Sequence, residues 1–155
     1  MKIWITSDHH FNHENIIKYC KRPFGSIEEM NEVMIRKWNE KVGKEDNVIH
    51  LGDFGFGDMK KIEEIRKKLN GNIFLLAGNH ESYKKMENCG FIVIREGIIQ
   101  IKNFILSHRP LSLEKIPKGF VNIHGHIHEK ESKYGINVSV EKTNYEPVEL
   151  DELVK

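Results

Sequence analysis

Short apolar runs rich in β-branched and aromatic residues recur along the chain, and a polar cluster follows each run directly. The runs cover residues 3–5, 48–51, 73–76, 104–106 and 120–123. Such runs, bounded by turn residues, are typical of buried strands. If they are neighbouring strands of one sheet, their ends converge on one edge, where α/β proteins form their ligand crevices. The pattern therefore predicts that the polar clusters meet in space.

Stretches with helical periodicity separate the first strands. Ser26 and Glu29 form a capping box that opens a helix ending near residue 41. Asp58 caps the next helix, and Asn70-Gly71 stops it. Shorter helices are expected at 12–20 and 83–89. The apolar residues that recur at helical spacing, and that we expect in the core, are Ile27, Met30, Met34 and Trp38 in the first helix and Met59, Ile62, Ile65 and Leu69 in the second.

The pattern changes after Gly90, where apolar runs at 91–94, 98–101 and 104–106 leave little room for helices. This spacing predicts an antiparallel continuation and a second sheet packed on the first. Residues after 140 form either a loose tail or, at 147–150, an edge strand. A length of 155 residues suits a single domain over residues 1–155. We therefore expect an α/β (α+β) fold, a β-sandwich with helices on its outer faces.

The polar clusters supply carboxylate, carboxamide and imidazole groups. Such oxygen and nitrogen donors suit Mn, Fe, Co, Ni or Zn, and there are more of them than one tetrahedral ion takes. Two ions are the simpler interpretation, and they indicate a two-metal hydrolase. The clusters are Asp8-His9-His10, Gly52-Asp53, Gly78-Asn79-His80-Glu81, His108 and Gly125-His126-Ile127-His128.

Each cluster alone also has an ordinary structural explanation. Asp8 could turn the chain or cap a helix, and Gly52-Asp53 is common turn chemistry. Asn79-His80 could form a tight turn with a left-handed Asn, and a single histidine such as His108 is often part of a core. The ordered occurrence of all the clusters, each at a strand exit, favours one assembled site.

The same motifs resemble those of the calcineurin-like metallophosphoesterase superfamily, whose order is D-x-H, G-D, G-N-H-[D/E], H and G-H-x-H. The resemblance spans nearly the whole chain. It implies a four-layer αββα sandwich, with two mixed β-sheets flanked by helices. The stretch from Ser7 to Ile17, followed by Arg22-Pro23-Phe24, is also similar to a compact subgroup found in phages and prokaryotes.

The resemblance implies a role for each motif residue. Asp8, His10 and His128 would hold one divalent metal ion. Asn79, His108 and His126 would hold the other. Asp53 would bridge the two ions. Manganese is the preferred metal, with Fe, Ni, Co or Zn as alternatives.

His80 would lie beside the metals as a catalytic group that meets the phosphate or protonates the leaving oxygen, and Glu81 would orient it. His9 should point away from the site, because neighbouring positions alternate along a strand. His50 and His124 are interpreted as packing or supporting residues. His13 and Arg109 are candidates for substrate binding.

Composition constrains the partners. A net charge of +1 argues against a nucleic-acid-binding module that works by neutralising phosphates, although nucleotides or nucleic-acid ends remain possible substrates. Cys20 and Cys89 are expected to be free thiols. No signal-type stretch opens the chain and no apolar run is long enough for a bilayer, so we expect a cytoplasmic protein without membrane contact or an obligate protein partner. Gly52, Gly55 and Gly57 do not form a nucleotide-binding fingerprint.

The expected activity is hydrolysis of phosphate esters by a metal-bridging hydroxide. Phosphodiesters are preferred over monoesters, because the chain is too short for a cap domain and has no dense arginine cluster for a dianion. Two alternatives stay open. One is a catalytically silent binding scaffold with the same fold. The other is a mononuclear zinc hydrolase that uses only His108, His126 and His128.

Overall fold

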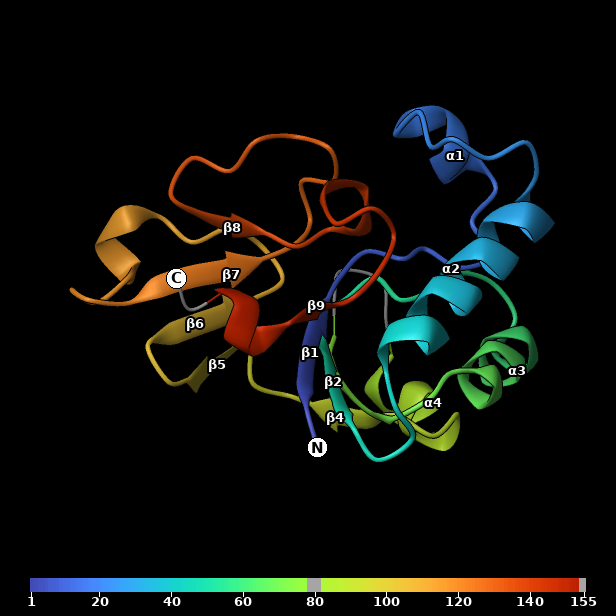
Figure 1. Cartoon of the computed structure of the whole chain (residues 1–155), viewed down its shortest axis with the longest axis horizontal. Coiled ribbons are helices and arrows are strands. Elements are labelled where there is room, and N and C mark those ends of the chain that lie inside the picture. Colours follow the sequence, from blue (N-terminus) through green and yellow to red (C-terminus); the bar gives the residue numbers. More distant parts are fainter. Residues whose placement is uncertain (78–81, 154–155) are drawn as a thin grey trace.

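Two mixed sheets lie face to face in the computed structural model, which describes residues 1–77 and 82–153 (Figure 1). The first sheet has the order β4-β3-β2-β1-β9. Its strands are parallel except β9, which runs antiparallel to β1. The strand bounds are Ile3–Thr6 for β1, Asn47–His50 for β2, Asn72–Leu76 for β3, Ile92–Ile94 for β4 and Val148–Glu149 for β9.

The second sheet has the order β5-β6-β7-β8. The strands β5 and β6 form an antiparallel pair, whereas β7 and β8 continue the sheet in parallel. The bounds are Ile98–Ile101 for β5, Phe104–Ser107 for β6, Val121–His124 for β7 and Gly135–Asn137 for β8. The sheet order corrects two expectations. The apolar runs are divided between two sheets, and the run at 91–94 joins the first sheet in parallel because a helix precedes it.

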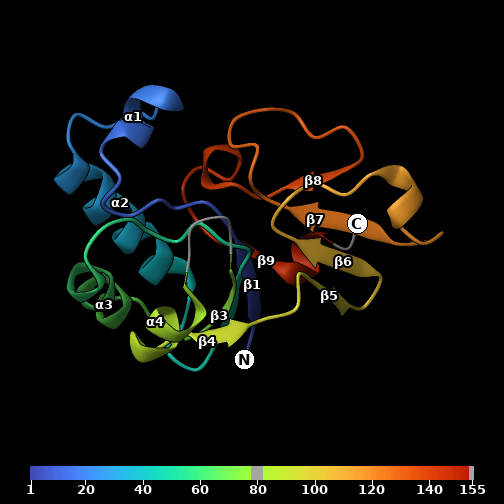
Figure 2. The same cartoon turned by 180° about the vertical axis from the view of Figure 1, so that it is seen from behind.

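The α-helices cover the outer face of the first sheet (Figures 1 and 2). The helix N-termini follow the predicted capping chemistry, since Ser26 accepts a hydrogen bond from the Glu29 N–H and Asp58 accepts one from the Lys60 N–H. The predicted helix at 12–20 is shorter than expected. The helix bounds are Asn15–Tyr19 for α1, Ile27–Lys41 for α2, Met59–Lys68 for α3 and Tyr83–Asn88 for α4.

Short 3-10 turns lie in loops beside both sheets. The Leu111 N–H donates to the side chain of Asn122, on the face of β7 opposite to the core residue Ile123. The three turns are η1 (Leu113–Lys115), η2 (Val140–Lys142) and η3 (Leu150–Leu153). Residues 141–153 therefore do not form a loose tail, and β9 is the predicted edge strand. Two mixed sheets flanked by helices confirm the predicted fold class.

The core consists of two apolar clusters, one on each face of the first sheet. The cluster under the helices contains Met30, Met34 and Trp38, all fully buried, as their helical spacing predicts. The cluster between the sheets contains Ile5, Leu51, Leu76, Leu106 and Ile123. Because this second cluster fixes the two sheets against each other, it also fixes the relative positions of their strand ends.

Cys20 and Cys89 are free thiols, as predicted. Among the described residues, no helix combines the length and the apolar character needed to cross a membrane.

Candidate metal centre

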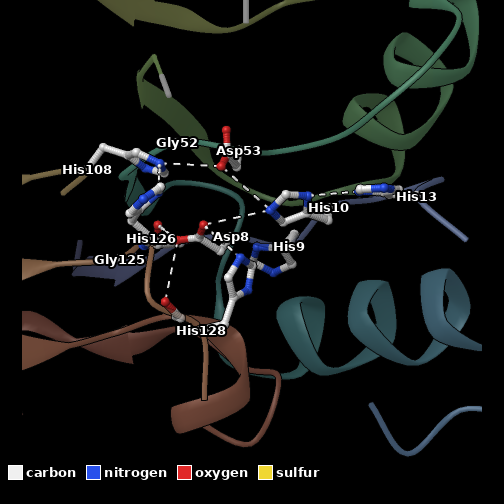
Figure 3. Close-up of polar contacts among 12 residues, drawn as sticks. Asp8, His9, His10, His13, Gly52, Asp53, His108, Gly125, His126 and His128 are labelled. Carbon is white, nitrogen blue, oxygen red and sulfur yellow. Dashed lines mark hydrogen bonds and ion pairs between the residues drawn. The ribbon is translucent and has the colours of Figure 1, made fainter. Parts of the chain in front are cut away.

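The candidate site lies where the strand ends of the two sheets meet (Figure 3). The first sheet contributes the residues after β1 and β2, and the second sheet contributes those after β6 and β7. The residues brought together are Asp8, His10, Asp53, His108, His126 and His128. The predicted residues Asn79, His80 and Glu81 lie outside the described part of the chain.

Asp8, His10 and His128 form one group of donors, with their ligand atoms within 4.8 Å of one another. Oδ1 of Asp8 lies 3.8 Å from Nε2 of His10 and 3.8 Å from Nε2 of His128. These separations exceed hydrogen-bonding distance. They leave a space between a carboxylate and two imidazole nitrogens that could hold a cation.

Asp53, His108 and His126 form the second group. Oδ2 of Asp53 lies 3.3 Å from Nε2 of His108, which lies 3.3 Å from Nδ1 of His126. The same Asp53 oxygen is 3.6 Å from Nε2 of His10 in the first group. Figure 3 shows Asp53 between His108 and His10. Its carboxylate therefore joins the two groups.

The polar atoms of the first group fit a metal ion. Asp8 Oδ1 and His10 Nε2 are buried, and neither has a hydrogen-bond partner in the described part of the chain. Leaving a buried carboxylate oxygen without a partner costs several kcal/mol on the scale of about 2–7 kcal/mol for polar groups. A divalent cation would satisfy both atoms at once.

The backbone of the site is unusual. Asp8, His10, Asp53, His126 and His128 all have positive φ angles, between 53° and 71°. This left-handed conformation costs a residue with a side chain about 1–2 kcal/mol. Strained backbone persists where the surrounding structure enforces it, and it is frequent at functional sites. Among the ligand candidates that the structure describes, only His108 lacks this conformation.

Asp8 also holds the loop of the G-H-x-H motif against the first sheet. Its Oδ2 accepts hydrogen bonds from the Ser7 hydroxyl at 2.5 Å and from the His126 N–H at 2.8 Å. A Cβ atom on Gly125 would lie 2.1 Å from the Ser7 hydroxyl oxygen and 2.2 Å from Asp8 Oδ2. The glycine of the motif is therefore required by the close approach of the two sheets.

Hydrogen bonds on the side away from the site orient two of the ligand candidates, His108 and His128. Nδ1 of His108 donates to the Leu51 carbonyl at 2.9 Å, because a carbonyl can only accept. Nδ1 of His128 lies 2.9 Å from a carboxylate oxygen of Glu141, and it is the donor for the same reason. In both imidazoles Nε2 is left facing the site, which is the usual arrangement of a metal-binding histidine.

Arg22 and Glu141 form a buried ion pair beneath the site, at 2.9 Å. Arg22 also donates to the backbone carbonyls of Asp8 and His9. No sequence motif surrounds Glu141, so its role cannot be predicted from the sequence, and Arg22 stands out there only through the subgroup resemblance. Cys20, His128 and Glu141 also come within 4.8 Å of one another, but the Arg22 guanidinium already neutralises Glu141 there.

Burial and neighbouring charges shift the pKa values in the site. Burial raises the pKa of Asp8, but the contact with His10 and the charges of His108 and His128 outweigh it and hold the pKa well below its usual value. Burial lowers the pKa of His128, yet its bonds to Cys20 and Glu141 outweigh burial and raise the pKa to about 10. In the protein without metal, His128 is therefore protonated on both ring nitrogens and positively charged at neutral pH.

The remaining histidines support the site from the core. His9 is fully buried and stacks on Phe11, with the ring centroids 5.0 Å apart, so it points away as predicted. Nδ1 of His50 accepts from the Gly52 N–H at 3.1 Å, in the turn before Asp53. His124 contacts the Ser132 hydroxyl at 2.7 Å. Burial lowers the pKa of His50 to about 3, so this histidine remains neutral and acts as an acceptor.

The two substrate-binding candidates adjoin different donor groups. Nδ1 of His13 is 3.2 Å from Nδ1 of His10, so His13 adjoins the first donor group. Arg109 is exposed. Burial, followed by the charges of His108 and Arg109, lowers the pKa of His126, which places the Arg109 charge near the second group.

The chain is similar to known proteins over its whole length. The family model for calcineurin-like phosphoesterases matches residues 1–155. An uncharacterised protein of Methanocaldococcus jannaschii is 40% identical over 169 residues, covering 99% of this chain and 90% of that protein. The crystal structure of a protein of unknown function from Aquifex aeolicus is similar with a TM-score of 0.77 and 28% identity, covering 99% of this chain and 97% of the other.

Proposed function

Because this chain belongs to the calcineurin-like phosphoesterase family, we propose that it hydrolyses phosphate esters, preferably phosphodiesters, with two divalent transition-metal ions. Manganese is the preferred metal. Asp8, His10 and His128 hold one ion. Asn79, His108 and His126 hold the other. Asp53 bridges them.

The observation that carries this proposal is the pairing of two donor groups through one carboxylate. Asp53 lies within 3.6 Å of a histidine from each group. A mononuclear zinc site of His108, His126 and His128 would need all three imidazoles on one ion. Instead, His128 groups with Asp8 and His10, and the other two histidines group with Asp53. The grouping supports two ions over one.

The charge of the donor set suits phosphate. Asp8 and Asp53 are the only anionic ligands in the proposed set, so two divalent ions leave a positive surplus. When bound, the ions supply a hydroxide nucleophile at neutral pH and neutralise the phosphate oxygens. His80 positions the phosphate or donates a proton to the leaving oxygen, and Glu81 holds the tautomer of His80.

The preference for diesters rests on the lack of a dense arginine cluster in the sequence. Arg109 is the arginine beside a metal motif, and it is exposed. A phosphate dianion would need more positive charge than a monoanionic diester, usually from a bidentate arginine.

The second candidate function, a silent scaffold, would not require metal. We retain the cytoplasmic location as a prediction, which cell fractionation would test.

The test is metal analysis combined with turnover on a generic aryl phosphodiester. We expect about two ions per chain for a two-metal centre, loss of activity on chelation, and better recovery with Mn, Ni or Co than with Mg. Imidazole-rich ligand sets disfavour the hard, octahedral Mg ion. One ion per chain would support the mononuclear alternative, and a folded protein with neither metal nor activity would support the scaffold.

A further inference from the structure

A pocket of about 330 Å³ opens beside the first donor group. It begins at His10 and Asp53 and continues to an apolar wall formed by Met59, Ile62 and Met86. Its volume is at the lower end of the range for small-molecule sites, about 300–1,000 Å³. A phosphate at the metal centre would place one of its two ester substituents in this pocket.

An aromatic shelf, formed by Phe56 and His13, lines the same pocket. The two rings are stacked, with their centroids 4.9 Å apart and their planes at 23°. Phe56 nevertheless remains 58% exposed, and Tyr19, which contacts His13 edge to face, is 70% exposed. Exposed aromatic rings beside a polar site are typical stacking surfaces for flat ligands.

The loop that carries Phe56 is held firmly. The Phe56 N–H donates to the Phe11 carbonyl at 2.9 Å, and Phe11 pairs with Gly55 in an isolated bridge. A Cβ atom on Gly55 would lie 2.5 Å from the side chain of Ile62, so the backbone approaches α3 closely. His13 is in turn fixed against His10. The shelf therefore keeps a defined position relative to the metal centre, as a binding site requires.

The charges around the pocket favour a short ligand. The adjoining hollow shares Met59 and contains Lys60 and Lys85, but also Glu63. With a net charge of +1 over the whole chain, there is little excess for neutralising a run of phosphates. Stacking on an aromatic ring, in contrast, needs only one flat group. Nucleotides are the common biological phosphate esters that carry such a group.

We propose that the substrate is a short phosphodiester that bears a nucleobase, and that the base stacks on Phe56 while the phosphate occupies the metal centre. This inference rests on the proposed function, because the metal centre fixes the phosphate. The shelf would thereby favour substrates that carry a base, a selection that the metal ligands alone do not provide.

The test compares a dinucleotide with a glycerophosphodiester, which has no ring. Phe56→Ala should lower kcat/KM for the dinucleotide about 5- to 150-fold, since stacking on an aromatic side chain is worth about 1–3 kcal/mol per base. The loss on the ringless diester should be much smaller. Phe56→Trp should restore most of the dinucleotide activity. Leu113→Ala, which removes an exposed apolar side chain in η1, is the matched control.

Binding provides a readout that does not depend on catalysis. A hydrolysis-resistant phosphorothioate dinucleotide containing 2-aminopurine should lose fluorescence when its base stacks on the metal-loaded protein, and Phe56→Ala should abolish this quenching. Quenching without hydrolysis of any phosphate ester would overturn the proposed function and leave the shelf in place. Hydrolysis of ringless diesters without quenching, or equal losses of kcat/KM on both substrates, would overturn the shelf alone.

Discussion

Glu141 accepts a hydrogen bond of 2.9 Å from His128, on the side of the imidazole that faces away from the metal centre. Arg22 donates to the same carboxylate oxygen from Nε and Nη2, at 3.0 and 2.9 Å. Its Nη2 also donates to the Asp8 carbonyl, and its Nη1 donates to the His9 carbonyl. A single buried ion pair therefore supports ligand candidates from both sheets. Its contribution to metal binding can be measured separately from that of the ligands.

Replacing Glu141 with Gln should weaken metal binding without removing a ligand. Partners behind a metal-binding histidine typically contribute 10- to 100-fold in affinity, so we expect a loss of about that size. The measurement is calorimetric titration with Mn²⁺, well below the unfolding temperature, because Arg22 loses its counter-charge in the variant. Glu131→Gln, at a highly exposed carboxylate that pairs with Lys142, is the control. Unchanged affinity in Glu141→Gln would show that the ion pair only stabilises the fold.

Metal binding should release a proton from His128. The pKa of His128 is raised to about 10 in the protein without metal, so at pH 7 an ion must displace a proton from Nε2. Affinity at that site should therefore rise with pH, by about tenfold per unit for one displaced proton, until the pKa is reached. Titration in buffers with different ionisation enthalpies counts the released protons. If the Glu141→Gln variant released as many protons as the native protein, the hydrogen bond to Glu141 would not be the cause of the raised pKa of His128.

Asp53→Asn and Asp8→Asn should have different consequences. Asparagine tolerates the left-handed backbone of both positions, so each change tests the carboxylate alone. A bridging carboxylate serves both ions and an amide bridges poorly, so Asp53→Asn should lose more turnover. The free energy of unfolding should fall more in Asp8→Asn, by about 1–3 kcal/mol. The reason is that the hydrogen bonds from Ser7 and His126 would then go to a neutral amide oxygen and not to a charged carboxylate. Equal losses of turnover in the two variants would exclude the bridging role of Asp53. Urea unfolding measures the stability of both variants.

His80→Ala should keep its metals and lose rate. General acid catalysis contributes about 100- to 10,000-fold, so the loss should be large for an alkyl diester and smaller for an aryl diester, whose leaving group departs without a proton. His126→Ala, as a matched ligand variant, should lose metal and activity together on both esters. Metal loss in His80→Ala would make His80 a ligand. Equal rate losses on both esters would make it a phosphate-positioning group.

Asp46 should contribute acid-sensitive stability. Its carboxylate accepts from the Lys2 N–H, the Trp4 indole and the Gly43 N–H, which lower its pKa from 3.8 to about 2. A lowered pKa stabilises the fold above pH 3.8, and this stabilisation is lost as the pH falls towards 2. Asp46→Asn should therefore lower Tm at pH 7 and make little difference near pH 2. Asp151→Asn, at an exposed ion pair, provides the comparison.

The sequence predicts the local part of the site well. Asp8, Asp53 and His126 each follow an apolar run, and strand ends can be read from such runs. It does not show which sheet a run joins, because a buried strand has the same composition in either sheet. Glu141 could not be predicted, since only the packing of η2 under His128 makes it a partner. The left-handed backbone also depends on tertiary contacts, such as the hydrogen bond from the His126 N–H to Asp8.

Each proposed ion takes ligands from both sheets, with His128 opposite Asp8 in one group and Asp53 opposite His108 in the other. Two bound ions would thus be cross-links between layers that the chain connects only through loops, and Asp8 and His128 lie far apart in the sequence. Binding that requires both layers in place stabilises only the docked arrangement. The bound metal would then add to the stability that the apolar cluster between the sheets already provides.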